Sequence, residues 1–230
     1  MLRTLVLPAS IIFSLSLLLL SSCESSQSGG PVIPPLEGED RYKFKERSIW
    51  QKPGVVFDAM GDLEEKVVAD IGAGDGFFAH RLARLADRVI AVEIDDHWVK
   101  YINDTLRFTE LGEEFRPRLV ARLTAPDDPG LEENEVDVVL IVNTFLEIEG
   151  KEAYLKRLYP TLKEGGKIVI VDWKKKQTGF GPEQSRRIPL FELEKMLQDA
   201  GYELVESDDG SLDFQYIVVA EKREEQTISE

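Results

Sequence analysis

The chain has 230 residues, of which 43% are hydrophobic, and its formal net charge is −15. After about forty non-globular residues at the start, this length allows one α/β domain with a full hydrophobic core. So acidic a surface repels phosphate backbones, so we do not expect a nucleic-acid substrate. Residues 174–176 and 186–187 form basic clusters, which we interpret as solvated loop charges.

The N-terminus has the layout of a secretory signal peptide. Arg3 precedes an apolar run over residues 5–20 that is short for a membrane-spanning helix, and small residues follow. Leu20-Ser21-Ser22-Cys23 resembles the lipobox of bacterial lipoproteins, and the chain has no other cysteine for a disulfide. We therefore predict a signal peptide over residues 1–22 and a lipid anchor on Cys23. The protein would be a membrane-anchored lipoprotein of the cell envelope, on the periplasmic or extracytoplasmic face. An uncleaved N-terminal anchor is the alternative.

A tether and a lid precede the first strand. Residues 23–40 are rich in Ser, Gly, Pro and acidic side chains, which predicts a flexible tether before a domain over residues 41–222. The polar residues 223–230 predict a disordered tail. Because aromatic side chains combine large apolar area with a polar handle, the start of the domain can fold over a site and contact substrate. A helix that only packs on the sheet is the alternative. The lid candidates are Tyr42, Phe44, Trp50 and Gln51.

From residue 67 onward the pattern alternates strands and helices, which predicts a largely parallel sheet covered on both faces. The expected strands are 67–71, 89–93, 118–121, 136–142 and 167–172, and the expected helices are 77–86, 96–111, 150–162 and 190–200. Two last strands, 202–207 and 214–221, flank the turn signal Asp208-Asp209-Gly210-Ser211 and should form an antiparallel hairpin at the sheet edge. The expected class is α/β.

The most informative stretch runs from Val67 to Gly76, reading VVADIGAGDG, and the next strand ends on Glu93. Its glycines lie in a strand-to-helix turn, where glycine permits unusual backbone angles and lets a ligand approach the main chain. A dinucleotide site has the spacing G-x-G-x-x-G, whereas this turn has G-x-G-x-G. The spacing therefore disfavours a dinucleotide oxidoreductase.

This turn, introduced by Asp70 and followed by Glu93, resembles that of class I S-adenosylmethionine-dependent methyltransferases. Residues 136–144 and 162–173 also resemble their fourth and fifth strands. The resemblance covers roughly residues 42–222 and implies a Rossmann-like, mostly parallel sheet of seven strands, with S-adenosylmethionine as cofactor. Glu93 would then accept hydrogen bonds from the ribose hydroxyls. The methionine end would lie on Asp70, Gly72, Ala73, Gly74 and Gly76. A glycine turn of another α/β protein, with Glu93 only capping its strand, is the alternative.

In open α/β sheets the ligand lies outside the carboxyl ends of the strands. Glu147 is the first candidate for a proton acceptor there and Asp172 the second, with surface carboxylates as the alternative. Asn143 is a further cofactor candidate, and Thr124 is one for the adenine pocket. The candidate substrate-binding residues are Trp50, Gln51, Thr144 and Phe145.

Histidine and metal chemistry find little support in the sequence. Related proteins often carry a histidine where this chain has Leu146, which weakens a transferred acid–base assignment. His80 and His97 lie on predicted helices, and we interpret both as solvent-facing rather than catalytic. Neither a histidine pair nor a cysteine cluster indicates a metal site.

The sequence thus predicts a membrane-tethered methyltransferase that acts on an unidentified acceptor, a small molecule or a protein. A supply of S-adenosylmethionine outside the cytoplasm is not expected. The alternative is therefore a non-catalytic cell-envelope protein that binds a nucleoside or metabolite on a methyltransferase fold.

Overall fold

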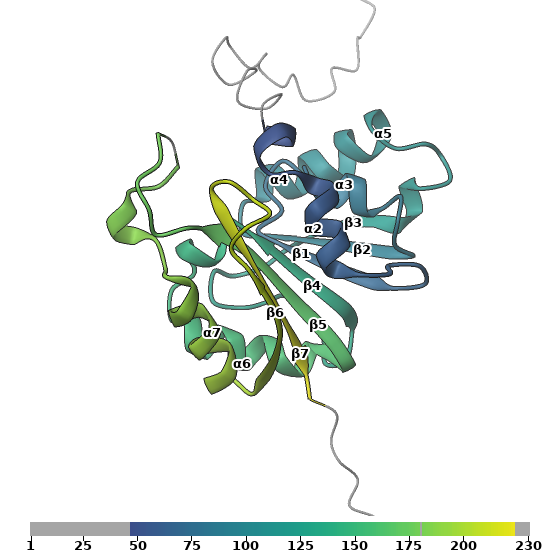
Figure 1. Ribbon diagram of the computed structural model, residues 1–230. Helices are drawn as coiled ribbons and strands as arrows, with labels where there is room; N and C mark the ends of the chain where they lie inside the picture. Colours follow the sequence, from purple (N-terminus) through teal and green to yellow (C-terminus); the bar gives the residue numbers. More distant parts are fainter. Residues whose placement is uncertain (1–46, 180, 224–230) are drawn as a thin grey trace, which may run out of the picture. The chain divides into compact units, whose positions relative to one another are not determined.

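The computed structural model describes residues 47–179 and 181–223. Within them, seven strands form one sheet in the order β3-β2-β1-β4-β5-β7-β6 (Figure 1). Strands β1 to β5 are parallel, whereas β7 is antiparallel to both β5 and β6. The predicted class, a mostly parallel α/β sheet closed by an antiparallel hairpin, is confirmed. The strands are β1 (Val67–Ile71), β2 (Arg88–Glu93), β3 (Leu119–Leu123), β4 (Val136–Val142), β5 (Leu162–Trp173), β6 (Tyr202–Asp208) and β7 (Gln215–Lys222).

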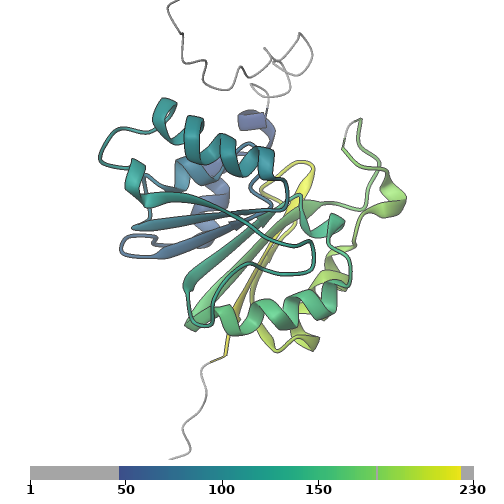
Figure 2. The same ribbon diagram turned by 180° about the vertical axis from the view of Figure 1, so that it is seen from behind.

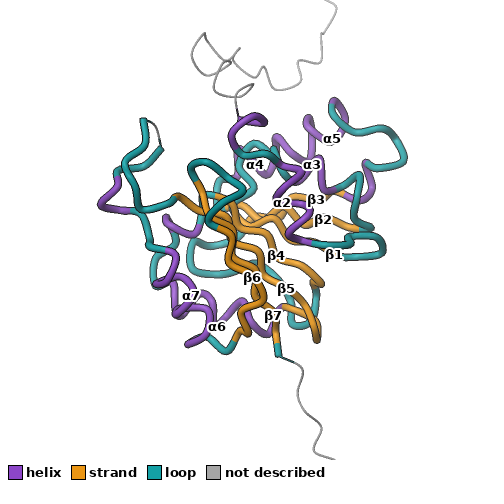
Figure 3. The backbone as a smooth tube through the Cα atoms, in the orientation of Figure 1, coloured by secondary structure: helices purple, strands orange, loops and turns teal. Residues whose placement is uncertain are grey.

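Helices lie along both faces of the sheet, as the views from opposite sides and the tube show (Figure 1; Figure 2; Figure 3). One face is packed by the helices of the first half of the domain, and the other by α6 and α7. None of the described helices is long and apolar enough to cross a membrane. The α-helices are α2 (Pro53–Met60), α3 (Ala79–Leu82), α4 (Asp96–Tyr101), α5 (Arg107–Thr109), α6 (Lys151–Leu158) and α7 (Leu190–Asp199).

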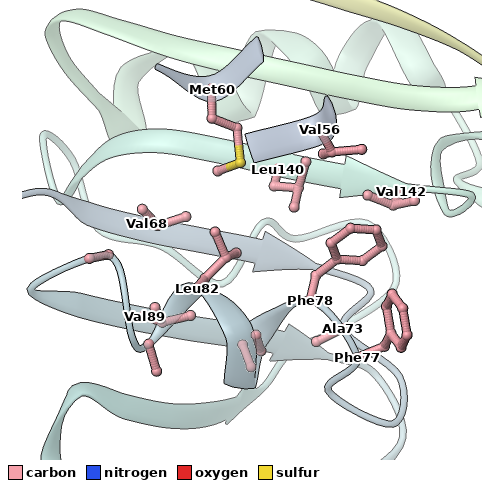
Figure 4. Packing of buried hydrophobic residues seen from close by; sticks show 14 of the residues in the cluster. Val56, Met60, Val68, Ala73, Phe77, Phe78, Leu82, Val89, Leu140 and Val142 are labelled. Carbon is pink, nitrogen blue, oxygen red and sulfur yellow. The ribbon is translucent and has the colours of Figure 1, made fainter. Parts of the chain in front are cut away.

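The sheet separates two hydrophobic clusters because successive strand residues point to opposite faces. Figure 4 shows one of them, where Val56 and Met60 of α2 lie next to Leu140 of β4. Val68 of β1 belongs to this cluster, whereas Ala69 belongs to the other. By the same alternation, the side chain of Asp70 is directed to the face that α2 and α3 cover.

Several predicted boundaries need correction. The helix expected over 150–162 ends at Leu158, because Pro160 has no N–H to continue it, and a 3₁₀ turn follows. The helix expected over 77–86 is reduced to α3. The helix expected over 96–111 contains a π-helix at Ile102–Leu106, where the Asn103 side chain bonds both the N–H and the carbonyl of Ala121 at 2.9 and 3.0 Å.

His80 is also corrected, because it is buried rather than solvent-facing. Only 8% of the residue is exposed, and its Nδ1 lies 2.7 Å from the carbonyl oxygen of Gly76. Burial lowers the pKa of its imidazole. His97 is exposed, as expected.

Several predictions concern residues outside the described ranges. These are the signal peptide, the lipid anchor at Cys23, the tether, the lid residues Tyr42 and Phe44, and residues 224–230 of the tail.

Candidate functional site

The glycine turn joins β1 to α3 with three left-handed residues. Gly72, Gly74 and Gly76 have φ values of 71°, 53° and 75°. A Cβ on Gly72 would lie 2.3 Å from the Thr144 side chain, and one on Gly76 would lie 2.3 Å from Leu106. A Cβ on Gly74 would meet nothing within 4 Å. The outer glycines therefore serve close packing, whereas the middle one borders open space that a ligand can enter.

Glu93 closes this turn against the tip of β2. Its Oε2 accepts a hydrogen bond of 2.8 Å from the backbone N–H of Gly74, and its Oε1 accepts one of 2.8 Å from Ile94. The N–H groups of Gly72 and Ala73 both donate to the carbonyl of Val92, at 2.8 and 3.2 Å. The carboxylate is held at the rim of the turn by the backbone and is 8% exposed.

A cleft of about 360 Å³ opens at the tips of β1, β2 and β4. It gathers six of the predicted site residues, which come from four separate parts of the chain. A larger hollow of about 770 Å³ lies elsewhere and contains none of the predicted site residues. The cleft is lined by Ile71, Gly72, Val92, Glu93, Ile94, Thr124, Ala125, Pro126, Asp128, Asn143, Thr144, Glu147, Ile148, Glu149 and Tyr154.

Three of these lining residues have fixed side chains. Thr124 donates from Oγ1 to the carbonyl of Asp128 at 3.0 Å. Thr144 donates to the carbonyl of Val142 at 3.1 Å. Asn143 has a left-handed backbone with φ of 57°, and its Oδ1 accepts a 2.6 Å hydrogen bond from Gln215. These three side chains are therefore oriented by hydrogen bonds within the protein.

Asp70 lies below the glycine turn and is 2% exposed. Burial raises the pKa of its carboxyl to about 7, although the nearby charge of Arg47 opposes the shift. Its Oδ2 is buried and has no hydrogen-bond partner. Because a buried acceptor without a donor is costly, this atom fits a ligand that brings a donor, such as an ammonium group.

The two predicted proton acceptors are differently placed. Glu147 lines the cleft, but both of its oxygens accept from Nη2 of Arg186, at 2.9 and 2.7 Å. Asp172 is not a cleft residue: its Oδ1 accepts from its neighbour Trp173 at 2.7 Å and its Oδ2 from Leu146 at 3.0 Å. Burial raises the pKa of Asp172 to about 6. Asp172 therefore positions the turn after β4. This geometry does not favour the catalytic role that was predicted for Asp172.

Phe145 departs from its predicted role as a substrate contact. The residue is fully buried, and it belongs to the hydrophobic cluster under α6 and α7. The tip of β4 thus presents Asn143 and Thr144 to the cleft and turns Phe145 into the core.

Residues 47–51, which we call the strap, cross the carboxyl end of the sheet. At one end Arg47 forms an ion pair of 3.1 Å with Asp75 of the glycine turn. At the other end the ring of Trp50 lies 5.2 Å from that of Trp173, at the tip of β5. The side chain of Gln51, which is 1% exposed, accepts a hydrogen bond from Arg47, and its Nε2 has no partner.

Sequence reasoning missed three residues at this end of the sheet. Tyr154 lines the cleft from α6, and nothing in its local pattern sets it apart from a core tyrosine. Arg47 is one charge among several in its segment. Gln215 gave a usable signal, because an amide that opens the apolar run of β7 needs a partner.

Comparison with known proteins agrees with this geometry. Residues 69–170 match a family model described as a methyltransferase domain. A crystal structure of an S-adenosylmethionine-dependent methyltransferase from Aquifex aeolicus superimposes with a TM-score of 0.70, over 80% of this chain and 97% of that one, at 22% identity. The described domain belongs to the class I S-adenosylmethionine-dependent methyltransferase superfamily. S-adenosylmethionine is therefore its cofactor, as predicted.

Two curated relatives of this methyltransferase domain carry related names. Phosphoethanolamine N-methyltransferase 3 of Arabidopsis thaliana is 28% identical over 189 residues, which are 76% of this chain but 37% of that protein. The chain thus spans little more than a third of that relative's length. A probable S-adenosylmethionine-dependent methyltransferase of Mycolicibacterium smegmatis is 24% identical over 183 residues, which are 76% of this chain and 67% of that protein.

One structural neighbour has a different named activity. The crystal structure of the [4+2]-cyclase SpnF matches with a TM-score of 0.63 at 17% identity, over 75% of this chain and 81% of that one. The fold is therefore compatible with more than one reaction, and the acceptor has to be argued from the site itself.

Proposed function

We propose that the protein transfers a methyl group from S-adenosylmethionine to a small molecule or a protein. The observation that carries this proposal is the unpartnered Oδ2 of Asp70, buried beside the turn whose middle glycine borders open space. S-adenosylmethionine carries an ammonium group and a ribose, which suit the carboxylates of Asp70 and Glu93 respectively. The net charge of −15 does not favour nucleic acid as the acceptor.

The residues present suit this cofactor. Asp70 would hold the ammonium group, and the cleft side of Gly74 leaves room for the chain that follows. Glu93 would accept hydrogen bonds from the ribose hydroxyls while it keeps its bond to Gly74, because the two oxygens of a carboxylate together offer about four acceptor sites. When bound, the cofactor supplies a methyl group that is already activated by its sulfonium sulfur. The task of the protein is then to align the acceptor in a dry pocket.

Glu147 lines the cleft shortly after the end of β4. In the observed arrangement Arg186 occupies both of its oxygens, so it takes up a proton only after that pair separates. Both side chains are more than half exposed, and an exposed pair of this kind costs little to break. We therefore propose Glu147 as a conditional base, used only for acceptors that arrive protonated.

We further propose that the domain is tethered to a membrane of the cell envelope through a lipid on Cys23. The support is the sequence of residues 1–23, with its apolar run and lipobox-like end. Growth of the expressing bacterium with a palmitate label tests this proposal. The full chain should incorporate the label and Cys23→Ser should not, whereas equal labelling of both would contradict the anchor.

Calorimetry on the full chain in mild detergent tests the cofactor site. Saturable binding of S-adenosylmethionine is expected, and Glu93→Ala should weaken it at least about tenfold, because hydrogen bonds to a charged group contribute about 1.5–3 kcal/mol. Glu113→Ala is the matched control, since its side chain is 91% exposed. A nicotinamide dinucleotide should not bind.

Turnover is measured separately, as S-adenosylhomocysteine released in the presence of candidate acceptors. Release that depends on an acceptor supports the transferase. Tight cofactor binding without release for any acceptor class would favour the non-catalytic binding protein instead. Absence of cofactor binding would overturn the proposed function.

A further inference from the structure

Three tyrosines of the described residues are buried, and one of them lacks a hydrogen-bond partner. The hydroxyls of Tyr202 and Tyr216 each donate to a backbone carbonyl oxygen at 3.1 Å. The hydroxyl of Tyr154 makes no hydrogen bond to any residue that the structure describes, although only 2% of the residue is exposed. Because a buried polar group without a partner is costly, this hydroxyl calls for an explanation.

The Tyr154 hydroxyl is directed into the cleft. Tyr154 lies near the start of α6 and lines the cleft, and the rest of its side chain packs in the hydrophobic cluster under α6 and α7. The unpartnered side-chain atoms that protein atoms enclose completely belong to Gln51, Asp70, Arg107 and Gln215. Since the Tyr154 hydroxyl is not one of them, it still reaches open space, and the cleft is the space that Tyr154 lines.

Tyr154 lies at the end of the cleft next to β3. Burial raises the pKa of its phenol, and the nearby negative charge of Asp128 adds to the shift, so the hydroxyl keeps its proton at neutral pH. The carbonyl oxygen of Asp128 accepts from Oγ1 of Thr124 at 3.0 Å, and the N–H of Thr124 donates to the carbonyl of Glu93 at 2.9 Å. A nucleoside whose ribose lies on Glu93 therefore has Thr124, Asp128 and Tyr154 on the side where its base can lie.

The cleft suits a flat, largely apolar ring. Ile94, the residue after Glu93, lines the cleft and is 57% exposed. Pro126 and Ile148 also line it. Its volume of about 360 Å³ is within the range of small-molecule sites, which are mostly apolar and carry a few polar groups that fix orientation. A base that covers these apolar residues is then selected by the polar groups at its edge.

The three polar side chains near β3 offer different hydrogen-bonding groups. The hydroxyl proton of Thr124 is already donated to Asp128, so its oxygen can only accept. The Asp128 carboxylate also only accepts, and its Oδ1 receives the N–H of Gly130 at 2.9 Å. Among these three side chains, Tyr154 supplies the free donor. The set matches a base that has an amino group next to an unprotonated ring nitrogen.

We propose that Tyr154 determines the base specificity of the cleft by donating its hydroxyl hydrogen to an unprotonated ring nitrogen of adenine. The acceptor oxygens of Thr124 and Asp128 are then available to the amino group of the base. A base with a carbonyl group in place of the amino group would meet these acceptors without a hydrogen to donate. The assignment rests on the proposed function for the place of the ribose at Glu93, and it does not require turnover.

Calorimetry on the full chain in mild detergent tests this assignment with S-adenosylhomocysteine and three analogues. The 7-deaza and 1-deaza forms each replace one ring nitrogen by C–H, and S-inosylhomocysteine replaces the amino group by a carbonyl. One deaza form should bind about tenfold more weakly than S-adenosylhomocysteine, because it leaves the Tyr154 hydroxyl without an acceptor. S-inosylhomocysteine should bind at least about tenfold more weakly, because it opposes acceptors to an acceptor.

A matched pair of variants separates binding from packing. Tyr154→Phe should bind S-adenosylhomocysteine about tenfold more weakly and should no longer distinguish it from the sensitive deaza form. Its Tm should be unchanged or higher, because the hydroxyl has no partner among the described residues. Tyr202→Phe is the control: its hydroxyl donates to the carbonyl of Leu155 in the same helix, so its loss should lower the Tm and change binding by less than about twofold.

The outcomes separate this assignment from the proposed function. The assignment is overturned if Tyr154→Phe binds S-adenosylhomocysteine as tightly as the parent does, or if both deaza forms bind the parent as well as S-adenosylhomocysteine does. It is also overturned if the variant loses the same affinity for all four compounds, which would indicate packing alone, or if S-inosylhomocysteine binds the parent equally well. Absence of S-adenosylhomocysteine binding by the parent would overturn both the assignment and the proposed function.

Discussion

The carboxyl end of the sheet has two sides that are built differently. At the tips of β1 and β2, the Glu93 carboxylate and the Val92 carbonyl satisfy the N–H groups of the glycine turn, so this side is held in shape by its own bonds. On the other side, Nε2 of Gln51 in the strap and Oε1 of Gln215 at the start of β7 are buried without hydrogen-bond partners. The comparison teaches that the cofactor side is preformed, whereas the side near the strap keeps buried polar atoms that the described residues do not satisfy. Asp70 is the exception on the cofactor side, because its Oδ2 is buried without a hydrogen-bond partner.

The largest loss of stability is expected on the cofactor side. Gly72→Ala adds a Cβ 2.3 Å from Thr144 at a residue with φ of 71°. Overpacking and left-handed strain together should cost about 2–5 kcal/mol of the free energy of unfolding. Chemical denaturation measures this loss. A variant as stable as the parent would show that the turn is not rigidly packed against β4.

Asp70→Asn should stabilise the ligand-free protein and weaken ligand binding. Because the pKa of Asp70 is raised from 3.8 to about 7, the folded state binds its proton more tightly than the unfolded state does. Without ligand, this group therefore lowers stability progressively as pH rises from about 4 to about 7, and the penalty is full above that. The substitution should raise stability by about 2–4 kcal/mol at pH 8 and change it little at pH 4.

The same variant should lose affinity for S-adenosylmethionine at pH 8. Thermal unfolding at the two pH values and calorimetry at pH 8 measure the two effects. An equal change in stability at pH 4 and pH 8 would contradict the raised pKa. Unchanged affinity would remove Asp70 from the cofactor site.

Gly74→Ala is the counterpart of the first substitution. The added Cβ meets nothing within 4 Å, so only the left-handed strain remains, about 1–2 kcal/mol. Affinity for S-adenosylmethionine should nevertheless fall, because the methyl group occupies the space that the ligand needs. Stability and affinity are measured in parallel for Gly72→Ala and Gly74→Ala. The expected result is that Gly72→Ala mainly lowers stability and Gly74→Ala mainly lowers affinity.

The smallest change in stability is expected at Glu147. Glu147→Gln breaks an exposed pair with Arg186, so stability should change by less than about 1 kcal/mol. Methyl transfer to an acceptor that has no proton to lose should be unchanged. A large loss of activity with such an acceptor would show that Glu147 does more than accept a proton.

Much of the fold follows from the sequence, and the reasons are local. The limits of β1 and β4 agree with the prediction to the residue, because buried parallel strands are continuous apolar runs bounded by polar residues. The π-helix does not, because it accompanies a bond from Asn103 to a strand 18 residues further on. Among the cleft residues, Gly72 and Glu93 could be predicted, because the glycine spacing and a carboxylate at the end of the next strand form a recognisable sequence pattern.

The two predicted bases show why the rest of the site was harder to predict. Glu147 pairs with Arg186, 39 residues away, and Asp172 accepts the N–H of Leu146, 26 residues away. Such contacts are set by tertiary packing and leave no trace in the local pattern. The burial of Phe145 has the same origin, since the face of a turn that reaches solvent depends on the elements that cover it.

The bond between Asn103 and β3 has a consequence for how copies of the protein meet. β3 ends the sheet on one side, and an exposed strand edge is a template on which strands of other chains assemble. Asn103 occupies both main-chain groups of Ala121 on that edge, so a neighbouring chain cannot extend the sheet there without displacing it. The Asn103 side chain therefore disfavours association of two copies of the protein through the edge of β3.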